Sequence, residues 1–219
     1  MHEIYSLVSG PLVWIALLVF VCGSAWRIIS AVMLAQEREP VIISYMSLRY
    51  SLRSVLRWIT PFGATNMRMH PGMTVATFVF HICLVCVPLF LSAHVILWKE
   101  AWDVGWAVLP GTAADLMTLA VIGCCVFFLV RRITRPEVRY LTDWTDYAIL
   151  AMVAAPFVTG FWAAQQWPGH SAMTVLHILS GEIMLAAVPF TRLSHMIFFP
   201  LTRGHTGSEF GAVRHARDW

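Results

Sequence analysis

The sequence has few charged residues. Charged side chains make up 12% of the 219 residues, about half the usual share in a soluble domain, and a single lysine, Lys99, is present. Hydrophobic residues reach 58%, and the mean hydropathy is +0.70. One soluble core cannot bury this much apolar surface, so we expect a lipid bilayer to be the solvent. We expect one membrane domain over residues 1–219, with no nucleic-acid partner.

Signals for disulfides, covalent haem and a cleaved leader are also missing. All five cysteines fall inside apolar runs, which argues against a disulfide framework and favours small buried filler: Cys22, Cys83, Cys86, Cys124 and Cys125. Cys83 and Cys86 form a C-x-x-C, but Val87 follows where a covalent haem site needs histidine. The first apolar stretch has no basic segment before it and no small-residue cleavage site, so we expect a retained helix.

Five apolar stretches are long enough to cross the bilayer, which takes about 20 helical residues. They run roughly from Val8 to Ser30, Gly72 to Ile96, Ala113 to Val130, Tyr147 to Ala164 and Met173 to Phe199. The sequence therefore predicts an all-α integral membrane protein with five transmembrane helices.

The basic residues predict the orientation. Of the 15 lysines and arginines, 14 lie near the end of, or after, the first, third and fifth stretches, and only Lys99 falls on the other side. The positive-inside rule places the arginine-rich side in the cytoplasm. We therefore expect the N-terminus outside, the C-terminus in the cytoplasm, and a multi-pass protein of the bacterial cytoplasmic membrane.

The segment from about Glu39 to Ile59 has the pattern of an interfacial helix. Arg49, Arg53 and Arg57 recur every four residues, and aliphatic residues cover much of the remaining surface. Two compatible hypotheses follow: a helix lying on anionic headgroups, or a docking platform for a cytoplasmic partner.

Histidines in the apolar stretches are the main candidates for chemistry, because a polar side chain at membrane depth is costly and usually functional. His70 and His81 are 11 residues apart, which in a continuous helix places them within about 20° of one face and roughly 16 Å apart. His177 and His195 are 18 apart, which is five turns and roughly 27 Å. His94 lies about 140° from the first face and is kept as a reserve candidate on the outer side.

Two helices that each present two in-line imidazoles match bis-histidine ligation of two b-type haems. In the antiparallel arrangement His70 and His195 hold the cytoplasmic-side iron, and His81 and His177 hold the outer one. Arg68 and Arg192 are placed to neutralise propionates of the cytoplasmic-side haem. The alternative is histidines hydrogen-bonded between helices or lining a proton path, in a haem-free anchor or proton-conducting subunit.

These residues also resemble a known family, the gamma subunit of respiratory nitrate reductase, a five-helix dihaem cytochrome b. Related subunits occur in transmembrane electron-transfer complexes of sulfate-reducing bacteria. The resemblance covers about residues 27–203 and rests on these motifs: His70-Pro71-Gly72, His81, Leu176-His177-Ile178, Pro189–His195 with Pro200, Arg135–Arg139 and Thr142–Leu150.

The resemblance implies the same two ligand pairs and a cytoplasmic iron–sulfur partner. It also implies a quinol site beside the outer haem, with menaquinone as a candidate substrate and Lys99 as its candidate lysine. The chain departs from the family in its wider spacing of the first two ligands and in the Trp-rich segment from Trp98 to Pro110. A periplasmic multihaem cytochrome c that docks on this face is therefore the competing donor.

Two further polar positions have predicted roles. Glu182 is the one acid deep in a span, and we expect it to hydrogen-bond another helix or to take a proton. Thr142 and Asp143 are expected to cap the fourth span, where acids complement the helix dipole.

Overall fold

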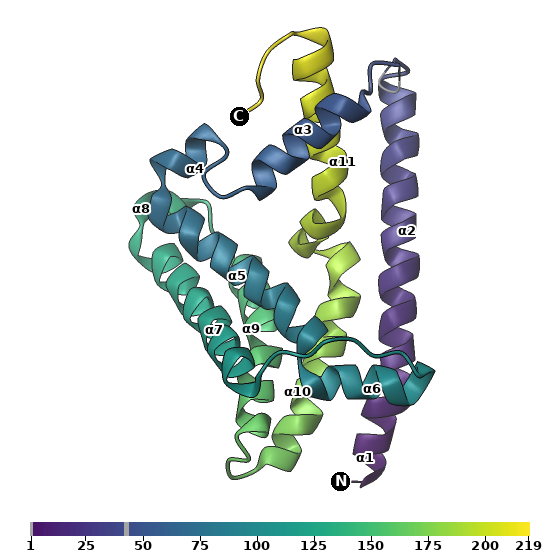
Figure 1. Cartoon of the computed structure of the whole chain (residues 1–219), viewed down its shortest axis with the longest axis vertical. Helices are drawn as coiled ribbons and strands as arrows, with labels where there is room; N and C mark the ends of the chain where they lie inside the picture. Colours follow the sequence, from purple (N-terminus) through teal and green to yellow (C-terminus); the bar gives the residue numbers. More distant parts are fainter. Residues whose placement is uncertain (1, 42–43) are drawn as a thin grey trace. The chain divides into compact units, whose positions relative to one another are not determined.

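The computed structural model describes residues 2–41 and 44–219, and these residues form helices and connecting turns without a β-strand. The α-helices are α1 (His2–Leu7), α2 (Val13–Arg38), α3 (Leu48–Ile59), α4 (Thr65–Met69), α5 (Pro71–Phe90), α6 (Ser92–Trp102), α7 (Gly111–Thr134), α8 (Pro136–Tyr140), α9 (Trp144–Ala164), α10 (His170–Ala187) and α11 (His195–Ser208). The shorter turns are η1 (Val8–Leu12), η2 (Val188–Phe190), η3 (Arg192–Ser194) and η4 (Glu209–Val213). Figure 1 shows them in chain order.

Five helical segments are long and apolar enough to cross a membrane, as the sequence predicts. They are Glu3–Arg38, Pro71–Phe90, Gly111–Thr134, Trp144–Ala164 and His170–Phe190. The first is longer than the predicted stretch because α1, η1 and α2 continue one another. The chain is therefore all-helical, with the helix set of a multi-pass membrane protein.

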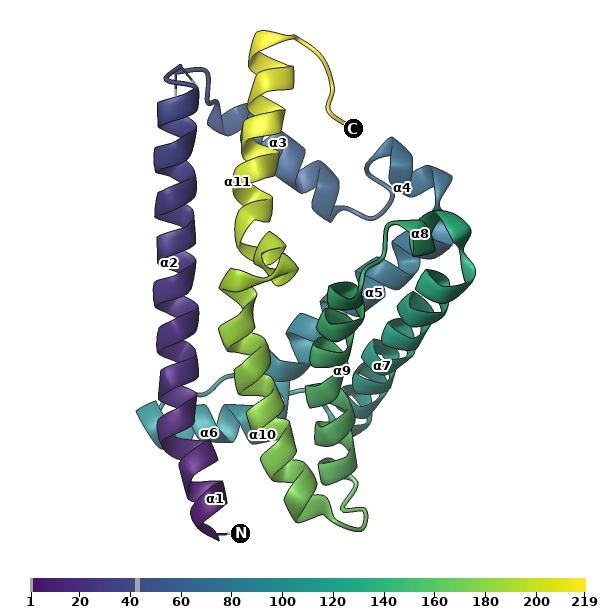
Figure 2. The same ribbon diagram turned by 180° about the vertical axis from the view of Figure 1, so that it is seen from behind.

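The second predicted span is shorter than expected, because the helix stops inside it. α5 ends at Phe90, Leu91 takes an extended conformation with ψ of 130°, and α6 starts at Ser92. Pro88 lies within the last turn of α5, where its missing N–H weakens the helix. As a result α6 bends away from the line of α5 and runs at an angle to it, as both views show (Figures 1 and 2).

The last predicted span is also interrupted. α10 ends at Ala187, and Thr191 is extended with φ of −121° before α11 begins at His195. Pro189 has no N–H to continue the ladder, and the Thr191 hydroxyl accepts a bond from the Leu193 amide. His177 and His195 therefore belong to different helices, and the five-turn argument that placed them on one face is wrong.

The chain contacts divide the protein into two compact units. The first contains Val75–Gly181 with Glu3–Tyr5, and the second contains Ser6–Thr74 and Glu182–Trp219.

The core of the first unit lies where α5, α7 and α9 pack together. Its buried residues are Cys83, Val87, Val121, Cys125 and Phe157. Cys83 and Cys125 thus act as small apolar filler, as predicted, whereas Cys22 on α2 is exposed.

The fourth span begins at the predicted cap. The Asp143 side chain accepts the Thr145 amide at 2.7 Å, and Asp146 accepts the Asp143 amide at 3.1 Å. Together they form a capping box at the start of α9. Arg132 lies 3.5 Å from the buried Asp146 carboxylate, which offsets the cost of burying that charge.

In the second unit, α3 packs against α11. The contact is polar and close: Ser51 donates to the Gly204 carbonyl at 3.0 Å, and Ser208 accepts the Ser47 amide at 3.0 Å. The helix is shorter than the predicted 39–59 segment, and Ile42 and Ile43 lie outside the described residues.

Candidate functional site

Two histidines of the first unit face one another. The imidazoles of His94, at the start of α6, and His177, in α10, have centroids 5.9 Å apart and planes within 8° of parallel. Both residues are half-buried. His94 is the reserve candidate of the sequence analysis, and the structure brings it to the place opposite His177.

The hydrogen bonds of the pair fix which nitrogen of each ring carries the proton. Nδ1 of His94 lies 2.9 Å from the Pro88 carbonyl, and Nδ1 of His177 lies 2.8 Å from the Pro156 carbonyl. A carbonyl only accepts, so both Nδ1 atoms carry the proton and donate it. Nε2 of each ring is then the unprotonated nitrogen that a metal binds, held by the outer-shell bond usual for histidine ligands.

The two rings are stacked, with centroids 5.9 Å apart. Each ring keeps one nitrogen, Nε2, for a metal, and two such imidazoles are the ligands that a b-type haem would take from the protein. The donor set therefore fits a bis-histidine haem.

The turn between α5 and α6 positions His94. A helix leaves its last carbonyls without amide partners, and here side chains and the following loop supply them. The Leu89 carbonyl accepts the Trp106 indole N–H at 2.7 Å, and the Phe90 carbonyl accepts the Leu109 amide at 2.8 Å. The Pro88 carbonyl, one residue before Leu89, accepts the bond from His94 Nδ1. The three bonds hold the turn that directs this imidazole.

A glycine of α9 makes room for His177. A Cβ at Gly160 would lie 2.7 Å from Nδ1 and 2.8 Å from Cε1 of the His177 ring. Pro156, whose carbonyl binds the same ring, is one turn earlier on that helix. Neither Gly160 nor Pro156 is among the predicted site residues, although a glycine and a proline four residues apart within an apolar span are a visible signal.

In two other candidate ligands, His81 and His195, Nδ1 also lies within hydrogen-bond distance of a backbone carbonyl. Nδ1 of His81 lies 2.8 Å from the Thr77 carbonyl, and Nδ1 of His195 lies 2.8 Å from the Arg192 carbonyl. The His81 ring also meets the Phe80 ring edge-on at 5.1 Å. The proton of each ring is thus on Nδ1, as for His94 and His177.

His70 differs from these four histidines. It ends α4 and precedes Pro71, with φ of −124° and ψ of 63°, so it is not part of α5. The residue before a proline avoids the helical region, which explains the break. The argument that places His70 and His81 on one helical face is therefore wrong, and the role of His70 as a ligand stays a prediction.

The predicted basic residues lie at helix ends. Arg68 donates to the carbonyls of Phe62 and Gly63 at 3.0 and 3.1 Å, which closes the turn before α4. Arg192 is exposed in η3, and Lys99 is exposed in the last turn of α6. The propionate roles of the two arginines and the quinol role of Lys99 stay predictions.

Other polar groups do not gather into a metal centre in the part of the chain that the structure describes. No three histidine, cysteine or acidic side chains within it form a group suited to a metal ion. A bis-histidine haem needs only two protein ligands. Glu182 has its Oε1 shielded, without a hydrogen-bond partner among the described residues.

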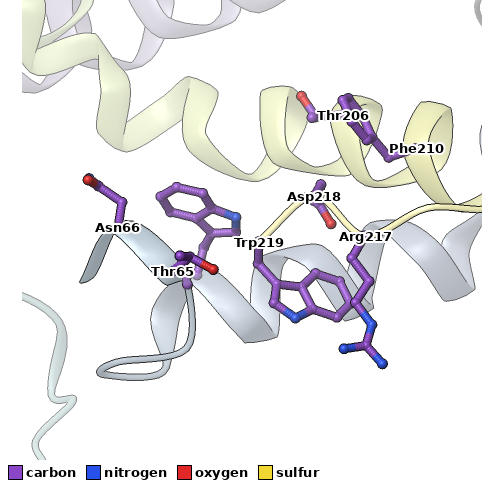
Figure 3. Close-up of a pocket in the computed structure, with 9 residues that line it drawn as sticks. Thr65, Asn66, Thr206, Phe210, Arg217, Asp218 and Trp219 are labelled. Atoms are coloured by element: carbon purple, nitrogen blue, oxygen red, sulfur yellow. The ribbon is translucent and has the colours of Figure 1, made fainter. Parts of the chain in front are cut away.

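A separate cavity of about 430 Å³ lies in the second unit (Figure 3). It is lined by Trp58, Ala64, Thr65, Asn66, Thr206, Phe210, Arg217, Asp218 and Trp219. The end of the chain forms one wall: Asp218 accepts the Ser54 hydroxyl at 2.5 Å and pairs with Arg203. The cavity contains none of the predicted haem or quinol residues.

Comparison with known proteins gives one informative match. A protein of Nitratidesulfovibrio vulgaris is 39% identical over 217 residues, which covers 96% of this chain and 95% of the relative. No family model matches the chain, and no solved structure matches it. The match extends over nearly the full length of both proteins and carries no activity with it.

Proposed function

The chain belongs to the same family as the Nitratidesulfovibrio vulgaris protein, and we propose that it is a dihaem b-type subunit that relays electrons across the cytoplasmic membrane. The observation that carries the proposal is the stacked pair of His94 and His177, in which each ring donates Nδ1–H to a carbonyl and keeps Nε2 for a metal. The resemblance to the nitrate reductase gamma subunit supports the same function.

The proposal assigns the outer haem to His94 and His177, with His94 in the place that the sequence analysis gave to His81. His177 has one nitrogen for iron, so it accepts a single haem and a single partner. For the cytoplasmic-side haem, His195 keeps its predicted role. Its predicted partner is His70. His81, whose Nδ1 is bonded to a carbonyl as that of His195 is, is the competing partner, and single variants distinguish the two.

The residues of the site select electron transfer over other haem chemistry. Haem iron with an imidazole on each face is a one-electron carrier without an open position for a further ligand. The carbonyls of Pro88 and Pro156 hold each Nδ1 proton, which raises the basicity of the ligand nitrogen.

The orientation and the partners belong to the same proposal. The arginine-rich side lies in the cytoplasm, where it meets an iron–sulfur subunit. The Trp-rich side lies outside, where a quinol such as menaquinol, assisted by Lys99, or a periplasmic multihaem cytochrome c exchanges electrons with the outer haem. The chain functions with these and other membrane subunits rather than as a complete enzyme.

Spectroscopy tests the proposal directly. We expect the purified complex to show a b-type α band in its reduced-minus-oxidised spectrum, and a pyridine haemochrome near two haems per chain. A folded complex without that band would contradict the proposal and leave a haem-free anchor or proton-conducting subunit.

Single variants test the ligand assignment. We expect His94→Ala and His177→Ala each to lose the same outer haem, which halves the haemochrome content. His195→Ala should lose the other haem, and so should one of His70→Ala and His81→Ala. If His94→Ala retained both haems while His81→Ala removed the one that His177→Ala removes, the predicted pair of His81 and His177 would be correct.

A further inference from the structure

The polarity of α3 is inverted for a helix that packs on its own protein. Its serines face α11, and Ser54 is fully buried there. Its large aliphatic residues point away and form an exposed stripe, with exposed fractions of 75% for Leu48, 51% for Leu52, 58% for Leu56 and 52% for Ile59. A surface helix in water has the opposite arrangement, with its aliphatic residues against the protein.

The interface that α3 makes with α11 is the small-residue type found between membrane helices. A Cβ at Gly207 would lie 2.4 Å from the Ser54 Cβ and 2.6 Å from the Tyr50 carbonyl. A Cβ at Gly204 would lie 3.3 Å from Ser51. Glycines against serines let the two backbones approach closely and leave the aliphatic side of α3 to another apolar phase.

Arginines border the aliphatic stripe. Arg49 and Arg57 follow Leu48 and Leu56 in the sequence and are exposed. Arg49 lies 5.8 Å from the centre of the Tyr50 ring, and Arg57 lies 5.2 Å from that of Trp219. Arg53, between them, is half-buried over the same two rings. Long basic side chains beside an apolar stripe suit phosphates at the boundary between headgroups and acyl chains.

The chain tethers α3 to membrane segments on both sides. The first apolar span ends at Arg38 and the next begins at Pro71, so α3 lies in the connection between two spans. Both ends of that connection are fixed at the same face of a membrane, which brings α3 near its surface.

We propose that α3 lies in the membrane interface, with Leu48, Leu52, Leu56 and Ile59 against acyl chains and Arg49 and Arg57 on the phosphates of anionic lipids. The proposal adopts the first of the two hypotheses for this segment: lipid, and not a protein partner, covers the aliphatic stripe. The inference depends on the α3–α11 packing and not on haem, so failure of either proposal leaves the other standing.

Photo-crosslinking in native membranes tests the inference. The photoreactive residue p-benzoylphenylalanine replaces Leu52 or Leu56, or Arg214 as a control whose side chain is 57% exposed. After irradiation we expect phospholipid adducts, detected by mass spectrometry of the chain, at the first two positions and not at the third. A protein adduct at Leu52 or Leu56 in place of lipid would overturn the inference, and so would lipid adducts of equal yield at all three positions.

Lipid composition tests the part of the arginines. The purified chain with the photoreactive residue at position 52 is reconstituted in vesicles of phosphatidylethanolamine and phosphatidylglycerol. We expect phosphatidylglycerol to be enriched among the adducts above its share of the vesicle. The double change Arg49→Gln and Arg57→Gln should reduce it to that share, whereas Arg139→Gln in α8 should leave the enrichment unchanged. Enrichment that persists in the double variant would contradict the role of the arginines.

Discussion

A glycine permits a close approach in each of the two units, and the two approaches serve different ends. In the first unit, Gly160 leaves space on α9 for the His177 ring, whose Nδ1 would lie 2.7 Å from an added Cβ. In the second unit, Gly207 leaves space for the Ser54 side chain and the Tyr50 carbonyl. The first gap holds a titratable ring in one orientation, and the second brings two helices together.

The side chain that occupies each space distinguishes a functional contact from a packing contact. If the space beside Gly160 served packing alone, an aliphatic side chain would be enough to fill it. The imidazole there instead donates to a backbone carbonyl and keeps its second nitrogen for another group. Beside Gly207, the hydroxyl of Ser54 is used within the protein, by Asp218 and Arg203. Changes at the two glycines should therefore affect different properties.

The largest expected effect is that of Gly160→Ala. The new methyl group would overlap the His177 ring and force it to turn or withdraw, which breaks the bond to Pro156 and misdirects Nε2. We expect loss of the outer haem, seen as a fall in pyridine haemochrome from about two haems per chain to about one.

The matched control for this change is Gly123→Ala. It lies on α7, another helix of the first unit, and an added Cβ there meets no atom outside its own helix within 4 Å. It should retain both haems, since alanine is the better helix former. Equal haem loss in both variants would show that any added methyl in this region disturbs the fold, and would remove the special role of Gly160.

The sequence predicts much of this fold because the relevant signals are local. The five spans follow from apolar composition over about 20 residues each. The cap of α9 follows from Asp143 and Asp146 at the start of an apolar run. Neither depends on where any other helix lies.

The partner of His177 is harder to predict from the sequence, because it depends on the turn between α5 and α6. The angular argument treats 72–96 as one helix, and a continuous helix places His94 about 140° from His81. The chain leaves the helix at Leu91, so that angle no longer applies. Pro71, Pro88 and Pro189 each stand within three residues of a break, and more weight on prolines would predict the breaks. It would not predict which rings then meet.

A smaller effect is expected for Gly207→Ala in the second unit. The added methyl lies too close to the Ser54 Cβ and to a backbone oxygen, so α3 must shift from α11. Overpacking of this kind costs about 1–3 kcal/mol. We expect a lower unfolding temperature in detergent with an unchanged haem spectrum.

Gly204→Ala is the matched control on the same face of α11. Its methyl group would lie 3.3 Å from Ser51, a contact that a small side-chain movement relieves, so the loss of stability should be less. If Gly207→Ala removed haem as Gly160→Ala is expected to, the distinction between the two contacts would fail.

The smallest expected effect concerns the turn between α5 and α6, which positions His94 opposite His177. Trp106→Phe keeps an aromatic ring but removes the indole N–H that binds the Leu89 carbonyl at 2.7 Å. A single neutral hydrogen bond contributes about 1 kcal/mol, so the turn that carries His94 should loosen and not collapse. We expect both haems at purification and faster transfer of one of them to apomyoglobin, by about fivefold if the whole contribution appears in the rate of haem release.

Trp144→Phe, at a position 77% exposed at the start of α9, serves as the control and should not change the rate. An unchanged rate in Trp106→Phe would mean that the bonds at the Phe90 and Pro88 carbonyls suffice to hold His94 without the indole N–H.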